Sequence, residues 1–194
     1  MALHITGDTA ADDLLTNNPL ALLVGMLLDQ QVAMEVAFAG PLKIEQRVGS
    51  IDAETIASTD PDDFVAAFKQ TPAVHRFPGS MAARVQSLCR ALLDDWGGDA
   101  SAIWTEGDPD GKTVLKRLKA LPGFGDQKAR IFLALLGKQC GFEGAGWREA
   151  SAPYGAEGTY MSVADITSPE TLLRVRESKR AAKAAAKKQT GANA

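Results

Sequence analysis

The sequence predicts an all-α fold. Apolar residues recur at helical spacing in successive segments, capping residues and prolines stand where those segments begin, and no useful alternation of apolar and polar residues marks a strand. The chain has 194 residues, 45% hydrophobic and 23% charged, which is enough for one core of ordinary size. This composition, without a heptad or triplet repeat, excludes a disordered chain, a coiled coil and a collagen.

The helices are predicted from their start signals and apolar faces. Asn18 is a capping residue, Pro19 occupies the first helical position, and the apolar face that follows ends at Gln31. Asp60 and Pro61 open the next helix in the same way. Three more helices follow, over residues 80–96, 112–120 and 126–136, and the first of these stops at a pair of glycines.

The charge is unevenly distributed along the chain. Residues 174–194 carry seven basic side chains and one acid, whereas the whole chain has a net charge of −3. This basic tail is rich in Ala and Lys and has no apolar stripe, so we expect a frayed helix or a disordered segment. It either keeps the protein soluble or adds salt-sensitive affinity for a nucleic-acid backbone. The expected organisation is an N-terminal segment 1–17, a helical module 18–137, a C-terminal segment 138–173 packed on it, and the tail.

Other features exclude several classes of protein. The longest apolar run, 20–28, is about half of what a bilayer-spanning helix needs, and the N-terminus has no secretory signal. We therefore expect a cytoplasmic protein without a membrane partner, associated with the nucleoid if it is bacterial. Cys89 and Cys140 are expected to be reduced, and His4 and His75 have no ligand partner at metal spacing, so no metal site is predicted.

The joint between the last two helices, 121–125, carries the clearest chemical signal. Pro122 ends one helix, and Gly123 and Gly125 permit a tight turn and a close approach of another backbone. The next helix begins at once, with free N–H groups that suit a phosphate without any sequence preference. A simple tight connection between two helices is the alternative.

Residues 118–133, which contain this L-P-G-F-G joint, resemble the helix-hairpin-helix of the base-excision DNA glycosylases related to endonuclease III, the HhH-GPD superfamily. Residues 22–31 are similar to an early buried helix of that family, which ends in a glutamine that faces DNA. Residues 81–98 are similar to the helix that precedes the hairpin helices. The three segments occur in the family order and cover about residues 18–137, so the resemblance implies a helix-hairpin-helix glycosylase-like bundle.

The resemblance implies a protein that bends duplex DNA, flips a damaged nucleotide and cleaves the bond between base and sugar. Gln31 would fill the gap left by that nucleotide, unless it merely caps its own helix. The hairpin would hold a phosphate, with a monovalent cation on its carbonyls. The expected DNA contacts are Gln31, Gly123, Phe124, Gly125, Lys128, Arg130 and Arg148, and the candidates for stacking on a flipped base are Trp147 and Tyr154.

The chain departs from the family at both catalytic positions. Bifunctional members have a lysine two residues after the second hairpin glycine, where this chain has Gln127. Lys128 is next to it, but one residue turns a helical side chain by roughly 100°, so we expect it to face solvent or a phosphate. No efficient lyase activity is therefore expected. The family aspartate, about eighteen residues further on, falls on Ala145.

Three acids are candidates for the role of the missing aspartate. Glu149 follows Trp147 and Arg148, which places an aromatic ring, a cation and a carboxylate together; Asp165 and Glu143 are the others. Each is otherwise a solvated or capping carboxylate. Many members also bind an iron–sulfur cluster through four cysteines in this region, where the chain has Cys140, so no cluster is expected.

The sequence therefore favours a monomeric DNA repair protein on duplex DNA, specifically a monofunctional glycosylase that acts through Glu149 or Asp165, with Gln127 at the lysine position. The main alternative is a non-catalytic helix-hairpin-helix protein that keeps the fold and binds DNA. A third possibility is a helical protein-interaction domain, which would show no salt-dependent DNA affinity.

Overall fold

The computed structural model describes residues 2–191, with side chains up to Ala185. All regular secondary structure in this range is helical, which confirms the predicted fold class. The helices are α1 (Thr9–Asn17), α2 (Pro19–Leu28), α3 (Met34–Phe38), α4 (Gly40–Val48), α5 (Ala53–Ser58), α6 (Pro61–Lys69), α7 (Pro78–Trp96), α8 (Ala102–Thr105), α9 (Gly111–Ala120), α10 (Asp126–Gln139), α11 (Trp147–Ala150), the 3-10 helix η1 (Val163–Asp165) and α12 (Pro169–Gly191).

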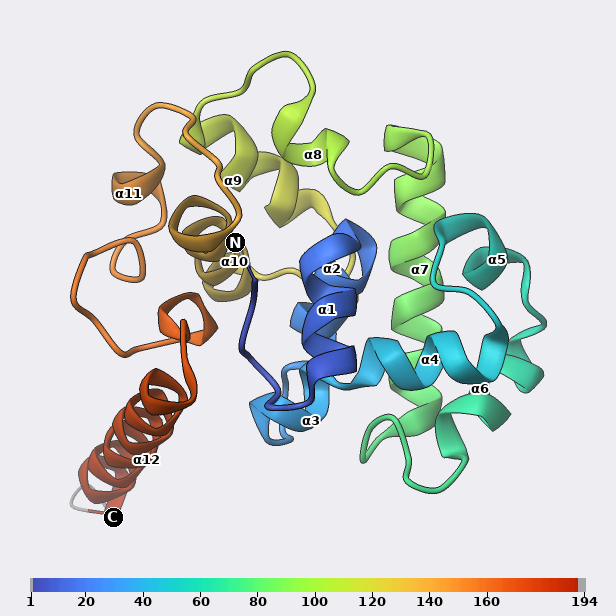
Figure 1. Ribbon diagram of the computed structural model, residues 1–194, viewed down its shortest axis with the longest axis horizontal. Coiled ribbons are helices and arrows are strands. Elements are labelled where there is room, and N and C mark those ends of the chain that lie inside the picture. The colour runs from blue at the N-terminus through green and yellow to red at the C-terminus, as the bar shows by residue number, and fades with distance from the viewer. Residues whose placement is uncertain (1, 192–194) are drawn as a thin grey trace.

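Helix α2 lies at the centre of the molecule, with α7 on one side and α10 on the other (Figure 1). Every residue of α2 from Leu20 to Leu28 is buried. The apolar run in the sequence is therefore a core helix that is covered on all its faces. Within residues 2–191, no helix is both long enough and apolar enough to cross a membrane.

Two groups of helices pack around α2. In the first, α5 and α6 cover α7, and the buried Gln86 of α7 donates to the backbone oxygens of Ile56 and Thr59 at 3.1 and 2.8 Å. In the second, α9 and α10 pack against each other and are joined by the 121–125 turn, and α11 and η1 pack against this pair. The hairpin thus belongs to the second group, and α2 connects it to the first.

The capping residues act as predicted. The Asn18 side chain accepts from the Ala21 amide at 3.0 Å, and the Asp60 side chain accepts from the amides of Asp62 and Asp63. Four boundaries differ from the prediction, because α2 ends at Leu28, α7 begins at Pro78, α9 begins at Gly111 and α10 extends to Gln139.

Six helices were not predicted: α1, α3, α4, α5, α8 and α11. All of them are shorter than three turns, and an isolated helix of that length is not stable in water. Tertiary packing stabilises them, and a periodic pattern in so short a segment is a weak signal.

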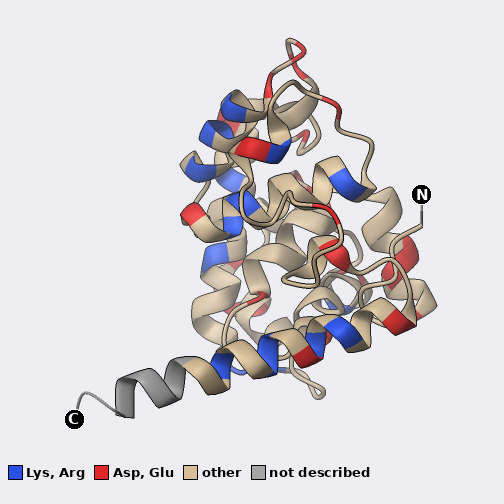
Figure 2. Cartoon of the chain, turned by 90° about the vertical axis from the view of Figure 1, so that its left-hand side faces the viewer, with Lys and Arg blue, Asp and Glu red and all other residues tan. Residues whose placement is uncertain are grey.

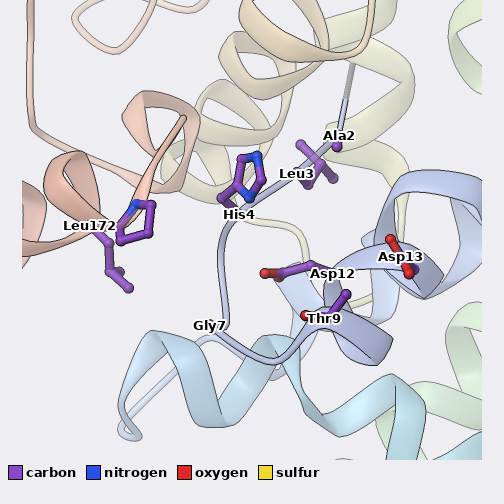
Figure 3. Close-up of a pocket in the computed structure, with 9 residues that line it drawn as sticks. Ala2, Leu3, His4, Gly7, Thr9, Asp12, Asp13 and Leu172 are labelled. Carbon is purple, nitrogen blue, oxygen red and sulfur yellow. The ribbon is translucent and has the colours of Figure 1, made fainter.

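The basic tail forms part of α12, which spans the expected boundary between segments 138–173 and 174–194. Val175 in the tail is buried, although no apolar stripe was predicted there, and Leu172 just before the tail is buried as well. Figure 3 shows Leu172 opposite His4, where the start of α12 and the N-terminal segment enclose a pocket of about 260 Å³. The carboxylate of Asp12 in this pocket accepts from the amides of Ile5 and Thr6, so it fixes the N-terminal segment.

Candidate nucleic-acid interface

The hairpin turn is packed directly against the central helix. Gly123 has φ of +82°, and a Cβ there would lie 2.3 Å from Cδ1 of Leu27 in α2. Phe124 is buried and meets Phe132 edge-on, with ring centroids 6.1 Å apart. Its contribution to a DNA contact is therefore restricted to its backbone.

The start of α10 is open to a ligand. Gly125 is the N-cap residue, no side chain caps the helix, and nothing lies within 4 Å of a Cβ built on Gly125. The first-turn amides have no acceptor within the helix. Asp126 in this turn pairs instead with Arg130 at 2.7 Å and Lys119 at 2.8 Å, and their hydrogen bonds lower the pKa of its carboxyl to about 2. Uncapped amides at a helix N-terminus form an anion-binding site.

The two hairpin glycines should respond differently to alanine. Gly123→Ala introduces strain at a positive φ and a clash with the buried Leu27, so it should lower the free energy of unfolding by about 2–3 kcal/mol. Gly125→Ala meets open space and should cost less than about 1 kcal/mol, the effect of a weaker N-cap. Urea denaturation followed by circular dichroism measures both, and equal costs would contradict the packing described for Gly123.

Lys128 was expected to face solvent or a phosphate, but it contacts the backbone of α2. Its Nζ donates to the backbone oxygens of Met26 at 2.9 Å and Leu27 at 2.5 Å, so it caps the C-terminal end of α2. Burial lowers the pKa of Lys128 to about 8, and the nearby Asp29 carboxylate opposes this shift. The ammonium therefore ties α10 to α2.

The low pKa of Lys128 predicts a specific pH dependence. Below pH 8 the ammonium is charged in both the folded and the unfolded protein, and its burial disfavours folding. Between pH 8 and 10.5 the folded protein loses this proton first, so its stability rises with pH. Relative to Lys128→Met, the wild type should gain about 2 kcal/mol between pH 7 and 9.5. Urea denaturation of both proteins at the two pH values measures this gain, and a constant difference would contradict it.

Gln31 lies beyond the end of α2, in an exposed loop with a left-handed backbone at φ of +56°. The capping role considered for it belongs to Gln30, whose amide donates to the Leu27 oxygen at 2.9 Å. The side chain of Gln31 makes no hydrogen bond within the described residues, so it is free to contact a ligand.

An exposed aromatic residue stands beside this loop. The buried His75 accepts from the Phe77 amide through Nδ1 at 3.0 Å, so its Nε2 carries the proton that it donates to the Gln30 oxygen at 2.9 Å. Arg76 lies over the Phe77 ring, 4.8 Å from its centroid, and reaches the Gln31 oxygen at 3.4 Å. Phe77 is 41% exposed. Phe77 was not among the candidate residues predicted from the sequence. The signal that could have identified it is an aromatic residue directly before the proline that starts a helix.

Gln127 and Tyr154 meet at the exposed side of the hairpin. The Gln127 amide donates to the Tyr154 hydroxyl at 3.0 Å. Arg130, which was expected to contact DNA, donates to Asp126 and, at 2.8 Å, to the Ala150 oxygen at the end of α11. Arg130 therefore holds α11 beside the first turns of α10.

Glu149 lies on α11, is exposed, and forms no ion pair within the part of the chain that the structure describes. Trp147 is packed against α10, since a Cβ on Gly137 would lie 2.4 Å from its ring. Arg148 covers the Trp147 ring at 4.4 Å and pairs with Glu157 at 2.9 Å. The Trp147 ring is thus partly buried and covered by Arg148, and Tyr154 is partly buried as well.

Asp165 is buried, and its side chain is fully engaged. It pairs with Lys138 at 2.6 Å, and it accepts from the Thr159 hydroxyl and from the amides of Met161 and Ser162. Lys138 also donates to the Ala156 oxygen at 2.6 Å. This network holds the segment between α11 and α12 on the end of α10.

The cysteines do not fit an iron–sulfur cluster, because such a cluster needs four ligands and the chain has Cys89, which is buried, and Cys140. Across residues 2–191, no three Cys, His, Asp or Glu side chains gather as a metal site would require.

The comparison with known proteins agrees with this geometry. The chain matches the family model described as HhH-GPD superfamily base excision DNA repair protein, over residues 24–191. No curated protein matches it. The matched range covers most of the chain, including the hairpin, the Gln31 loop and α12, and the chain therefore belongs to the HhH-GPD superfamily of base excision DNA repair proteins.

Proposed function

We propose that the protein binds duplex DNA and is a monofunctional DNA glycosylase, which hydrolyses the bond between a damaged base and its sugar. The observation that carries this proposal is the uncapped start of α10, whose hairpin packs on the end of α2. Helix α2 leads into the exposed Gln31, and the exposed Phe77 lies beside that loop. A duplex phosphate would bind the first-turn amides of α10, and a monovalent cation on the hairpin carbonyls stays a prediction. Gln31 and Phe77 would enter the duplex where a nucleotide is flipped out, since apolar side chains can separate base steps.

Glu149 is the carboxylate that we assign to the reaction. It is exposed and unpaired within the described residues, and Arg130 holds its helix beside α10, whereas the oxygens of Asp165 are occupied. As the bond between base and sugar breaks, the carboxylate would stabilise the positive charge that develops on the sugar, and it would accept a proton from the water that attacks the sugar carbon. The departing base takes up a proton from solvent, so the products are the free base and an abasic sugar. Tyr154 would stack on the flipped base.

A lyase step needs a neutral amine at the sugar carbon. Gln127 carries an amide, which cannot form a Schiff base, and the Lys128 ammonium is held on the oxygens of Met26 and Leu27. We therefore propose that the protein leaves the abasic strand intact.

Base release and strand nicking on end-labelled duplexes test the proposal. The panel contains uracil, hypoxanthine, 8-oxoguanine, an alkylated purine and an abasic site, each treated with and without alkali. We expect alkali-dependent cleavage at one lesion, its loss in Glu149→Gln, and its retention in Glu143→Gln, the matched exposed acid. Borohydride should trap no adduct on the abasic duplex. A trapped adduct or cleavage without alkali would contradict the monofunctional assignment.

A non-catalytic DNA-binding protein is the second candidate, and Ala145 at the position of the family aspartate favours it. Salt-sensitive binding to duplex DNA without base release from any substrate would establish this function instead. The DNA affinity of Gly125→Asp distinguishes both candidates from a protein-interaction domain. An Asp N-cap accepts hydrogen bonds from the α10 amides and stabilises the helix, but its charge repels a phosphate at the same place. Unchanged DNA affinity in Gly125→Asp would reject the hairpin as the phosphate site.

A further inference from the structure

Helix α12 runs past the Gln31 loop and is fixed there. Val175 is fully buried, Arg176 pairs with Glu35, and Lys179 lies 3.8 Å from Asp29 and 3.7 Å from the sulfur of Met34. The side chains of Asp29 and Glu35 are each only 15% exposed. These contacts set the direction of α12 relative to the loop, and they use the two acids that would otherwise repel DNA there.

The same contacts connect α12 to the hairpin. Asp29 follows the end of α2, where the oxygens of Met26 and Leu27 accept hydrogen bonds from Lys128 of α10. Lys128 therefore binds the end of α2 from α10, and Lys179 of α12 pairs with Asp29, which directly follows it. These contacts connect α10, the end of α2 and the middle of α12.

Beyond the loop, α12 carries basic side chains that are exposed. Arg176, Arg180 and Lys183 follow one another at spacings of four and three residues, which places them on one face of the helix. Arg180 and Lys183 are exposed and form no ion pair within the described residues. A groove of about 510 Å³ lies between α12 and the loop, and its α12 side is formed by Arg176, Lys179 and Arg180.

Basic and acidic residues are unevenly distributed over the molecule (Figure 2). In Figure 2, Lys and Arg gather along the left-hand edge of the molecule, and α12 extends toward that edge with basic residues along its described part. Acidic residues are more frequent in the loops at the top and on the side of the N-terminus. This distribution would orient a polyanion toward the left-hand edge of that view.

We propose that the Arg176–Lys183 face of α12 is a second contact for the phosphate backbone, which binds the duplex that flanks the nucleotide at the Gln31 loop. This inference rests on the proposed function and adds to it a binding surface outside the hairpin. Each phosphate that the face neutralises releases counterions, so α12 should contribute to the salt dependence of DNA binding and not to base release itself.

The experiment measures the affinity for a fluorescently labelled, undamaged 21-base-pair duplex by anisotropy at several NaCl concentrations. The α12 variant is Arg180→Gln/Lys183→Gln, which leaves the ion pairs with Asp29 and Glu35 intact. Lys69→Gln/Arg90→Gln is the matched control, because it removes two exposed charges from α6 and α7. Glutamine keeps the helix propensity, so both variants should fold.

The slope of log K against log[NaCl] is negative. We expect its magnitude to decrease by about 2 in the α12 variant and to stay at the wild-type value in the control. An α12 variant with the slope of the control would overturn the proposal. If Gly125→Asp weakens binding while the α12 variant does not, α12 is rejected and the proposed hairpin function stands. If the wild type shows no salt-dependent affinity, the proposed function itself fails, and the α12 contact fails with it.

Discussion

Replacing Lys138 by Met, or Asp165 by Asn, should destabilise the protein more than any other single change discussed. The ion pair between them measures 2.6 Å, and the two side chains are only 14% and 3% exposed. Removing one partner leaves a buried charge without compensation, which costs about 3–5 kcal/mol. The loss should appear as a lower urea midpoint at unchanged slope, because the folded core stays the same.

Two comparisons make this result specific. Glu170→Gln removes the exposed pair with Arg174 and should cost less than about 1 kcal/mol. The double variant Lys138→Met/Asp165→Asn should lose less than the sum of the single losses, because the unpaired charge is gone. Single variants within about 1 kcal/mol of the wild type would show that the network does not hold the 151–168 segment, and Asp165 would return as a catalytic candidate.

Apart from Glu149→Gln, the variants Phe77→Ala and Gln31→Ala should give the largest losses of base release. Stacking of an aromatic side chain on a base contributes about 1–3 kcal/mol, so Phe77→Ala should lower kcat/KM for base release by about 5- to 150-fold. Gln31→Ala should act in the same direction, because the gap left by the flipped nucleotide would stay unfilled. Single-turnover kinetics on the lesion identified by the duplex panel measure both effects.

Because Phe77 is exposed, the experiment can separate a loss of function from a loss of stability. Phe77 is exposed, so its loss should change the free energy of unfolding by less than about 1 kcal/mol, and affinity for undamaged duplex should change less than base release. Met161→Ala removes an apolar side chain that is equally exposed but lies near η1, and it should leave base release unchanged. Equal losses in Phe77→Ala and Met161→Ala would reject the role of Phe77.

The sequence alone determined the fold class and the hairpin. The helix starts at Pro19 and Pro61 and the apolar face of α2 are local signals, because a cap or a periodic face requires only neighbouring residues. The L-P-G-F-G turn is local for the same reason, and the family match includes it. The absence of a lysine at position 127 and of an aspartate at position 145 is also a property of the sequence alone.

Only the tertiary structure decided which of the candidate side chains are free to act. Lys128 and Asp165 were separate candidates in the sequence, but the packing of α10 on α2 and η1 surrounds them with backbone oxygens, amides and an opposite charge. Phe77 and Gln31 are far apart in the sequence, and the buried His75 brings their loops together. Burial and hydrogen bonding depend on residues distant in the chain, so no local pattern distinguishes an engaged carboxylate or ammonium from one that can meet DNA.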